Sequence, residues 1–455
     1  MTTARSLALD LLGAARERQG FVGDLLDDAL ADSELTPQDR RFVTHLVFGV
    51  SRRHGTLDTL LAPFCQRPLP NVEPVLLDIL RLGAYQLVFL TQVPPHAAVH
   101  ESVELAVYAE KPGAKGFVNG VLRRIAETVT ADFSQYAAAD AVPIDGNRYR
   151  KLTRAILPDP RRETAAYLVE AFSWPLWLAR RWLDRFGPDE CFRLAFYFQS
   201  PPPTWLRVNP LKMPRSDYAL MLAAGAIDAE NGEHPQALRL LDSVPIRALP
   251  GYAGGEFAVQ DHSSMLVASS LNVRPGMRVL DLCAAPGGKT THLAELMQDR
   301  GTIVACDIDA DRLATVTSLA TRLGLTCIET ALIADGDDAP SGPFDAALVD
   351  APCSNTGVLG RRPEVRQRLQ PNEFAHLIRL QTRLLKAAAT RVRPGGAVVY
   401  STCSIEYDEN RGLVEVVLRD DPTLSLEADH VAIPGRPSDG GYWARLRKGP
   451  GEPGA

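Results

Sequence analysis

The chain has 455 residues, 45% of them hydrophobic, and a formal net charge of −6 at pH 7. This length leaves ample room for a large core and suggests about three domains. The acidic net charge argues against nucleic-acid binding over the whole surface, because affinity for phosphate comes from Lys and Arg. Any RNA-binding surface must therefore be local.

The cysteines and the N-terminal segment indicate the compartment. Seven cysteines are scattered without C-x-x-C spacing, so neither a disulfide framework nor a structural zinc site is indicated. Residues 1–19 contain no apolar run of signal-peptide length, and no later stretch approaches about 18 uninterrupted apolar residues. We expect a cytoplasmic protein with reduced thiols, no metal and no membrane association.

The first third of the chain has helical periodicity. Apolar residues recur at a spacing of three to four, for example in Leu7, Leu11 and Leu12, which is typical of amphipathic helices. A Pro-Pro pair interrupts the pattern before a further predicted helix over residues 97–108. We expect a compact helical bundle over residues 1–140.

Short segments of this bundle are similar to the NusB-type helical RNA-binding domain. They are residues 39–43, 81–86, 93–99 and 116–124. The resemblance implies that the bundle binds ribosomal RNA or a nascent transcript, with Arg123 and Arg124 placed to meet phosphates. In the alternative, these helices only pack against a catalytic domain, because basic residues on one helix usually form a solvated face.

The middle of the chain is more irregular. Residues 130–148 mix Ala, Asp, Pro and Gly without a clear period, which is typical of a linker. Residues 150–254 combine a helical segment over 167–185 with a strand-like run over 204–208, so we expect a small α/β domain. Residues 207–212 are similar to a motif that helps to clamp RNA in RNA cytosine methyltransferases. On their own, Arg207 and Lys212 would be ordinary surface cations.

From residue 255 to residue 455, short apolar runs alternate with longer amphipathic segments. The runs are residues 279–282, 303–306, 346–349 and 397–400, and predicted helices cover residues 290–298, 311–323 and 374–392. The runs are too short for helices and too continuously apolar for exposed strands. They predict a Rossmann-like, doubly wound α/β sheet, which binds its ligand at the carboxyl ends of its strands.

A glycine-rich turn follows the first of these strands. It reads Cys283-Ala284-Ala285-Pro286-Gly287-Gly288-Lys289. The tail of this turn matches a phosphate-binding P-loop, but Cys283 stands where that loop needs its leading glycine, and G-x-G-x-x-G is absent. Asp307 lies about twenty residues further on, at a strand end suited to ribose hydroxyls. The combination favours S-adenosylmethionine, because the glycines let the backbone approach the cofactor and no pyrophosphate needs a cradle.

Two cysteines follow the last two predicted strands. Cys353 lies in the segment Asp350-Ala351-Pro352-Cys353, and Cys403 ends the segment Ser401-Thr402-Cys403. A thiolate attacks electron-poor ring carbons well, whereas a hydroxyl needs a partner base. The pair therefore indicates methyl transfer to a pyrimidine. Chemistry alone does not decide which thiol attacks.

Residues 283–289, 350–356 and 400–404 together resemble the Sun/Fmu (RsmB-type) family of bacterial ribosomal RNA cytosine-5 methyltransferases. The resemblance implies an all-α NusB-like bundle followed by a small α/β RNA-clamping domain and a class I methyltransferase domain. It implies methyl transfer from S-adenosylmethionine to carbon 5 of a cytosine in 16S ribosomal RNA. It also implies a cofactor site formed by Cys283, Ala284, Ala285, Pro286, Gly287, Gly288, Lys289, Asp307, Asp335 and Asp350.

The resemblance also divides the catalytic roles. It makes Cys403 the nucleophile, and it makes Cys353 the residue that assists release, with Asp350 contacting the cytosine and Lys289 as a possible activator of the thiol. The register of the Asp335 loop stays open by two or three residues. Small-subunit RNA is the expected partner of a monomer. The alternatives are a cytosine-5 methyltransferase for transfer RNA or another RNA, and a non-catalytic antitermination protein.

A group of arginines follows the Cys353 loop. They are Arg361, Arg362, Arg366 and Arg368, and we expect them to meet RNA phosphates. Gly360 before them, and Arg366-Gln367 where a lysine-aromatic pair is common, depart from the family's usual pattern. These departures concern the fine contacts to the substrate and not the reaction.

Overall fold

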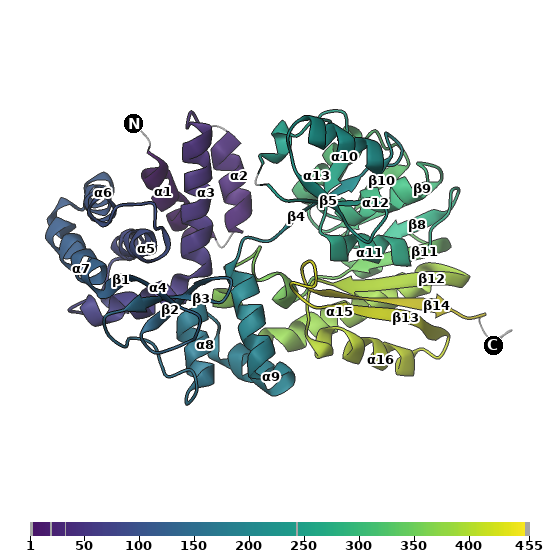
Figure 1. The fold of residues 1–455 in the computed structure, drawn as a ribbon. Coiled ribbons are helices and arrows are strands. Elements are labelled where there is room, and N and C mark those ends of the chain that lie inside the picture. Colours follow the sequence, from purple (N-terminus) through teal and green to yellow (C-terminus); the bar gives the residue numbers. More distant parts are fainter. Residues whose placement is uncertain (1–2, 19–20, 32, 243, 451–455) are drawn as a thin grey trace. The chain divides into compact units, whose positions relative to one another are not determined.

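The computed structural model describes residues 3–18, 21–31, 33–242 and 244–450. Met1, Thr2 and Gln19, which belong to the segment without signal-peptide character, lie outside the described residues. The chain forms two compact units (Figure 1). Unit 1 runs to Pro201 and also includes Leu359–Leu369, while unit 2 contains Pro202–Val358 and the described chain from Gln370 onward.

Unit 1 begins with the expected helical bundle. Its helices are α1 (Ala4–Arg18), α2 (Val22–Ala31), α3 (Pro37–Arg52), α4 (His54–Leu61), α5 (Pro74–Phe89), α6 (Pro95–Tyr108) and α7 (Lys115–Thr128). The helix α5 is buried on every side, because it is apolar all round and packs against α1, α3, α4, α6 and α7. Among the described residues, no helix is both long and apolar enough to cross a lipid bilayer.

The segment expected to be a linker forms a sheet instead. Strands β1 (Val129–Ser134), β2 (Ala141–Asp145) and β3 (Arg148–Leu152) pair antiparallel in the order β1-β3-β2. The linker prediction is wrong because each strand buries too few residues to show a period of two. Ala141, Val142, Tyr149 and Leu152 are nevertheless buried, and they lie on both faces of this small sheet.

Two helices complete the first part of unit 1, where the sequence indicated one. They are α8 (Thr164–Phe172) and α9 (Leu176–Gln199). Ser173 adopts a left-handed conformation with φ 59° and ends α8, and Gly187 with φ 76° breaks the course of α9. The returning segment Leu359–Leu369 contains the short helix α14 (Val365–Arg368).

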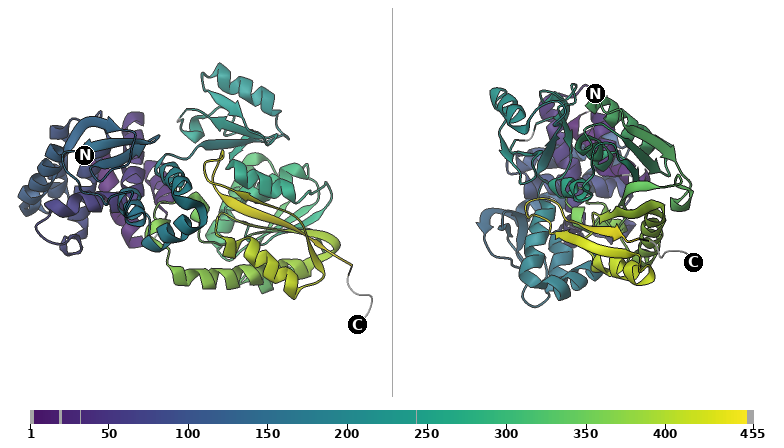
Figure 2. Two further views of the ribbon diagram at one scale, coloured as in Figure 1. Left: turned by 60° about the horizontal axis from the view of Figure 1, so that its bottom comes forward. Right: turned by 90° about the vertical axis from the view of Figure 1, so that its right-hand side faces the viewer.

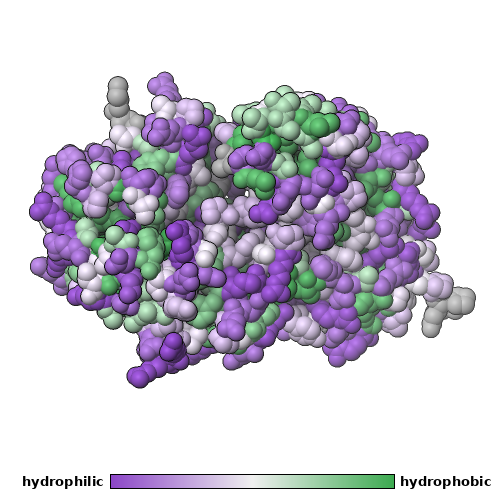
Figure 3. Space-filling view, in the orientation of Figure 1, coloured by the Kyte–Doolittle hydropathy of each residue, from purple (hydrophilic) through white to green (hydrophobic). Residues whose placement is uncertain are grey.

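Unit 2 begins with a small antiparallel sheet, which includes the predicted strand over residues 204–208, whereas the helices expected in the same small domain belong to unit 1. Its strands β4 (Thr204–Val208), β5 (Ala229–Asn231), β6 (Ala237–Leu240) and β7 (Phe257–Val259) lie in the order β5-β6-β4-β7. The helix α10 (Arg215–Ala224) covers the sheet with Tyr218 and Leu222. Hydrophobic residues gather over the α10 region in Figure 3, where Leu220 is 70% exposed.

The second sheet of unit 2 is the predicted doubly wound sheet. Its strands are β8 (Arg278–Asp281), β9 (Thr302–Asp307), β10 (Ile328–Leu332), β11 (Phe344–Asp350), β12 (Val392–Thr402), β13 (Leu424–Ala432) and β14 (Gly441–Lys448). Their order is β10-β9-β8-β11-β12-β14-β13. The five strands from β10 to β12 are parallel, whereas β14 joins β12 and β13 antiparallel. The sequence did not indicate β10, whose residues are partly exposed and include Glu329.

Helices cover both faces of this sheet (Figure 2). One face packs α11 (His262–Ser270), α12 (Gly288–Leu296) and α13 (Ala310–Leu323), and the other packs α15 (Pro371–Arg391) and α16 (Arg411–Asp420). Because both faces are covered, the inner strands are continuously apolar, which is the pattern that made them recognisable.

Candidate active site

The order in which the chain adds strands to the sheet reverses at β8. From β8 the chain proceeds through β9 to β10 on one side, and through β11 to β12 on the other. A doubly wound sheet binds ligands at the carboxyl edge of such a switch point. The predicted site residues after β8, β9, β11 and β12 all lie at this edge.

The glycine turn joins β8 to α12. The Gly287 amide donates to the Ala284 carbonyl at 2.8 Å, and Gly287 has φ 102°. A Cβ atom on Gly287 would lie 3.1 Å from the Val316 Cα, so both the backbone conformation and the space favour glycine. The turn therefore exposes backbone to a ligand at the beginning of α12.

Two of the predicted acidic residues differ in their relation to the glycine turn. Asp307 ends β9, is 5% exposed and accepts a hydrogen bond from the Ala285 amide at 3.2 Å. Asp335 is half-buried on the loop after β10, where its carboxyl group accepts from the Asp337 amide at 2.8 Å. Asp307 is thus bonded to the turn itself, whereas Asp335 caps its own loop.

Asp281 is a site residue that the sequence analysis missed. Its Oδ2 accepts a hydrogen bond from the Thr290 hydroxyl at 2.7 Å, while its buried Oδ1 has no hydrogen-bond partner within the described protein. Burial raises the pKa of Asp281 to about 7, against the opposing effect of Thr290. The available signal was an acidic residue at the end of an otherwise apolar strand.

We expect Asp281→Asn to change how the stability of the cofactor-free protein depends on pH. At pH values between the ordinary pKa of 3.8 and the raised pKa of about 7, the Asp281 carboxyl group holds a proton in the folded state and has released it in the unfolded state. Wild-type stability therefore falls as pH rises through this window. Asp281→Asn removes this fall, which urea unfolding at pH 5 and pH 8 measures. Exposed Asp184→Asn should keep the wild-type slope, and a wild-type slope in Asp281→Asn would contradict the assignment.

Asp350 connects β11 to the turn and to β12. Its carboxyl group accepts from the Lys289 ammonium at 2.7 Å and from the Ser401 hydroxyl at 2.8 Å. Burial alone would lower the pKa of Lys289, but Asp350, and less strongly Cys403, outweigh it, and the pKa is raised. Lys289 therefore remains a cation within electrostatic reach of the Cys403 thiol.

The two predicted cysteines meet at the same edge. The Cys353 and Cys403 sulfurs are 3.2 Å apart, and the Cys403 thiol lies 3.1 Å from the Asn355 Oδ1. The hydrogen bond with Cys403 and then burial raise the pKa of Cys353 well above its ordinary value. Cys353 therefore stays a neutral thiol.

The other cysteines of unit 2 pack against its cores. Cys306 and Cys327 are buried in the two cores of the large sheet, and burial raises the pKa of each to about 12. Cys283 is half-buried against one of these cores, and burial raises its pKa strongly. These thiols are poor nucleophiles.

The prediction that Arg366 meets phosphates is wrong. Arg366 is 4% exposed, and within unit 1 its guanidinium donates to carbonyls at or near the ends of three helices. The acceptors are the carbonyls of Arg52 (2.9 Å), Phe172 (3.2 Å) and Phe198 (2.7 Å), together with that of Leu359 (3.2 Å). The Nη1 and Nη2 groups of this one guanidinium thus satisfy carbonyls that a helix leaves unpaired at its end.

Two neighbouring arginines also contact residues of unit 1. Arg362 stacks over the Phe21 ring at 4.1 Å, and Arg368 donates to the Ala15 carbonyl at 3.4 Å. Both are half-buried in unit 1. Arg123 and Arg124 are exposed on α7, so these two keep the expected access to a phosphate.

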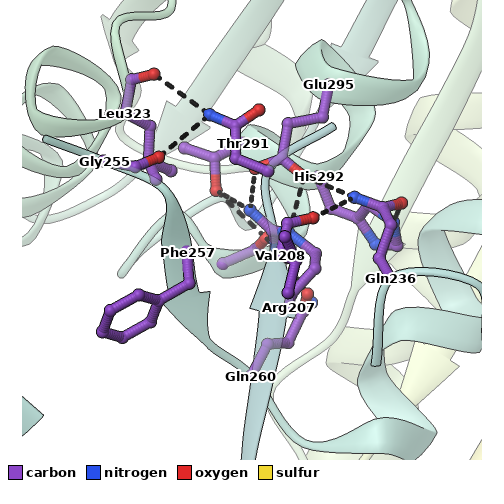
Figure 4. A network of polar contacts seen from close by, with 12 residues as sticks. Arg207, Val208, Gln236, Gly255, Phe257, Gln260, Thr291, His292, Glu295 and Leu323 are labelled. Atoms are coloured by element: carbon purple, nitrogen blue, oxygen red, sulfur yellow. Dashed lines mark hydrogen bonds and ion pairs between the residues drawn. The ribbon is translucent and has the colours of Figure 1, made fainter. Parts of the chain in front are cut away.

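Arg207 is also buried, and it is not a surface cation (Figure 4). Its guanidinium forms a two-pronged ion pair with Glu295 on α12, at 2.9 and 2.8 Å. It also donates to the Gly288 carbonyl at 2.6 Å. Gln236 donates to Glu295 at 2.8 Å and extends the network. Arg207 therefore fixes the beginning of α12 and does not reach RNA, while Lys212 is exposed.

These observations define a class of enzyme. The sheet is of the Rossmann-like type, and its glycine turn, the carboxyl group of Asp307 and the unpaired oxygen of Asp281 form a site for a nucleoside with a cationic amino-acid portion. Such a site fits S-adenosylmethionine, and two adjacent thiols lie at the same edge. The class is that of class I methyltransferases.

Comparison with known proteins agrees with this class. The model of the family described as 16S rRNA methyltransferase RsmB/F matches residues 268–437, the NusB family model matches residues 2–127, and an RsmF/B-like ferredoxin-like domain matches residues 174–247. Probable ribosomal RNA small subunit methyltransferase B of Bacillus subtilis is 34% identical, over 94% of this chain and 91% of that protein. The protein of the same name from Synechocystis is 39% identical, over 92% and 90%.

Solved structures share the fold. PH0851 matches with a TM-score of 0.79 and 23% identity, over 98% of this chain and 99% of that chain. A methyltransferase homologue from Pyrococcus horikoshii matches with a TM-score of 0.54 and 26% identity, over 60% and 95%. The chain belongs to the RsmB/F family of methyltransferases, and it is itself a methyltransferase.

Proposed function

We propose that this protein transfers a methyl group from S-adenosylmethionine to carbon 5 of a cytosine in 16S ribosomal RNA, through a transient bond between Cys403 and the base. The pair of sulfurs 3.2 Å apart, at the edge that also carries the glycine turn, is the observation that carries the proposal. The names of the relatives, which describe methyltransferases of small-subunit ribosomal RNA, support the substrate.

The residues at the turn suit the proposed cofactor, which supplies an electrophilic methyl group when bound. The open space at Gly288 would admit its methionine portion, Asp307 would accept from its ribose hydroxyls, and Asp281 would pair with its ammonium group. The structure of NSun6 from Pyrococcus horikoshii, which has the same fold, was solved with the S-adenosylmethionine analogue SFG.

Carbon 5 of cytosine is a poor nucleophile, and Cys403 overcomes this. The Cys403 thiolate adds to carbon 6, and carbon 5 becomes enamine-like and takes the methyl group. A base then takes the carbon 5 proton, the double bond re-forms as the bond between sulfur and carbon 6 breaks, and Cys403 leaves as a thiolate. This route replaces one difficult step by two easier ones. An unperturbed thiol has a pKa of about 8.5, so a cation such as Lys289 favours the thiolate.

Asp350 and Cys353 support these steps. Asp350 contacts the ring nitrogen or the exocyclic amine of the cytosine and orients the base for addition. The Cys353 thiol is adjacent to Cys403 and keeps its proton, so it can donate a hydrogen bond to the Cys403 thiolate as that thiolate leaves. The target cytosine must lie in a single-stranded loop or be turned out of its stack to reach both thiols.

Mapping of 5-methylcytosine tests the proposal. Bisulfite sequencing of ribosomal and transfer RNA from strains with and without the gene should reveal one cytosine of 16S RNA that depends on the gene. The purified protein should methylate unmodified 16S RNA with radiolabelled S-adenosylmethionine. A dependent site only in transfer RNA would replace the proposed substrate, and the absence of any dependent site together with no methyl transfer would refute the activity.

A further inference from the structure

The two loops that carry the thiols share one buried carboxyl group. It belongs to Glu409, which ends the short helix η7 (Tyr407–Glu409) and is 0% exposed. Its Oε1 accepts from the Ser354 amide at 2.9 Å, and its Oε2 accepts from the Ser404 hydroxyl at 2.6 Å. Because Ser354 follows Cys353 and Ser404 follows Cys403, Glu409 bridges the neighbours of both thiols.

Two further donors complete the carboxyl group. The Ser354 hydroxyl donates to Oε2, and the Gln381 side-chain amide donates to Oε1 at 2.9 Å. Gln381 lies on α15 and also donates to the Pro352 carbonyl at 2.9 Å. The Cys353 loop is therefore held on both sides of the thiol. A fully buried carboxyl group with four donors is costly to remove, since its donors would remain unpaired.

We propose that Glu409 is a positioning residue, which sets the distance between the sulfurs of Cys353 and Cys403 by fastening both loops to one point. This inference rests on the proposed function only in its consequence for methyl transfer. The geometry needed is tight, because a misplacement of about 1 Å can cost about 10²-fold in rate. Glu409 itself does not touch the base or the cofactor.

The choice of substitution separates hydrogen bonding from charge. In Glu409→Gln, the amide oxygen can still accept from the Ser354 amide and Gln381. The new NH₂ group meets two hydroxyls, which can accept as well as donate. In Glu409→Ala, all four donors lose their acceptor. Gln should therefore preserve the arrangement of the loops, and Ala should lose it.

The test uses the full-length protein and a readout that does not depend on activity. A trivalent phenylarsenoxide condenses with two adjacent thiols, forming two As–S bonds and releasing one water, so its affinity reports the distance between the sulfurs. We expect Glu409→Ala to weaken arsenical binding at least tenfold and to lower kcat about 10²-fold, the order of loss that displacement of reacting groups causes. Affinity for S-adenosylmethionine should not change, and Glu409→Gln should behave as wild type.

Controls separate this role from general stability. Val417→Ala removes buried volume from α16 without touching either loop, so it should lower the melting temperature but keep arsenical affinity. Cys353→Ser should abolish tight arsenical binding. If Glu409→Ala does not fold, Ser404→Ala removes one of the four donors to Glu409, together with the acceptor of the Glu406 amide, and should give a smaller loss of the same kind.

Two results would overturn the inference. One is a folded Glu409→Ala, or Ser404→Ala in its place, with wild-type arsenical affinity and kcat. The other is a folded Glu409→Gln as damaged as Glu409→Ala, since hydrogen bonding would then not be the cause. Failure of the proposed function gives a different result from failure of this inference. If the proposed function is wrong, Cys403→Ala keeps methyl transfer, and the arsenical affinity still reports whether Glu409 holds the two loops.

Discussion

Cys403→Ser should abolish methyl transfer to RNA and the covalent protein–RNA adduct. The hydroxyl of serine needs a partner base to attack carbon 6, and neither the Asn355 amide at 3.1 Å nor the protonated Cys353 thiol at 3.2 Å is a base. We expect kcat to fall by about 10³-fold or more, since removal of a nucleophile is among the most damaging substitutions in an enzyme. Incorporation of radiolabelled methyl groups and a denaturing gel for the adduct measure the two effects.

Cys353→Ser is the matched variant, because the two sulfurs are in contact and differ in their proposed roles. We expect it to form the covalent adduct and to accumulate it, since addition and methyl transfer remain possible while release is slow. Cofactor affinity should be unchanged in both variants. If Cys403→Ser kept methylation and the adduct while Cys353→Ser lost both, the two assignments would be reversed.

Arg207→Met should strongly destabilise the protein. It leaves the fully buried Glu295 without its ion-pair partner, and breaking a buried pair in this way costs about 3–5 kcal/mol. Glu295→Leu should cost a similar amount by leaving Arg207 uncompensated. The double variant replaces the pair with apolar side chains and should recover most of the free energy of unfolding, which urea denaturation measures.

Recovery of stability should not bring recovery of cofactor binding. Arg207 also donates to the Gly288 carbonyl at 2.6 Å, and the double variant still lacks this donor at the beginning of α12. We therefore expect weaker binding of S-adenosylmethionine in both Arg207→Met and the double variant, measured by equilibrium dialysis. Arg239→Met is the control, because the pair of Arg239 with Glu230 is exposed and contributes about 0–1 kcal/mol. A double variant as unstable as the single variants would contradict the role of the pair.

The sequence determined the large sheet and the position of its site. Apolar runs marked β8, β9, β11 and β12, because strands covered on both faces lose their alternation. The glycine turn and the acidic residue after β9 then indicated the cofactor, since each feature acts locally through backbone freedom or a strand-end carboxyl group. The strand β10 escaped notice because its partly exposed residues lack this continuous apolar pattern.

The tertiary structure alone decided which charged residues are inside. Arg207 and Arg366 belong to a residue type that usually lies at the surface. In the structure Arg207 pairs with Glu295, and Arg366 caps the ends of three helices. Asp281 and Glu409 were missed for the same reason. A buried polar group is stable only when its partners surround it, and these partners come from distant parts of the chain. The 3.2 Å between the two sulfurs also follows from strand order, which brings together thiols that are 50 residues apart.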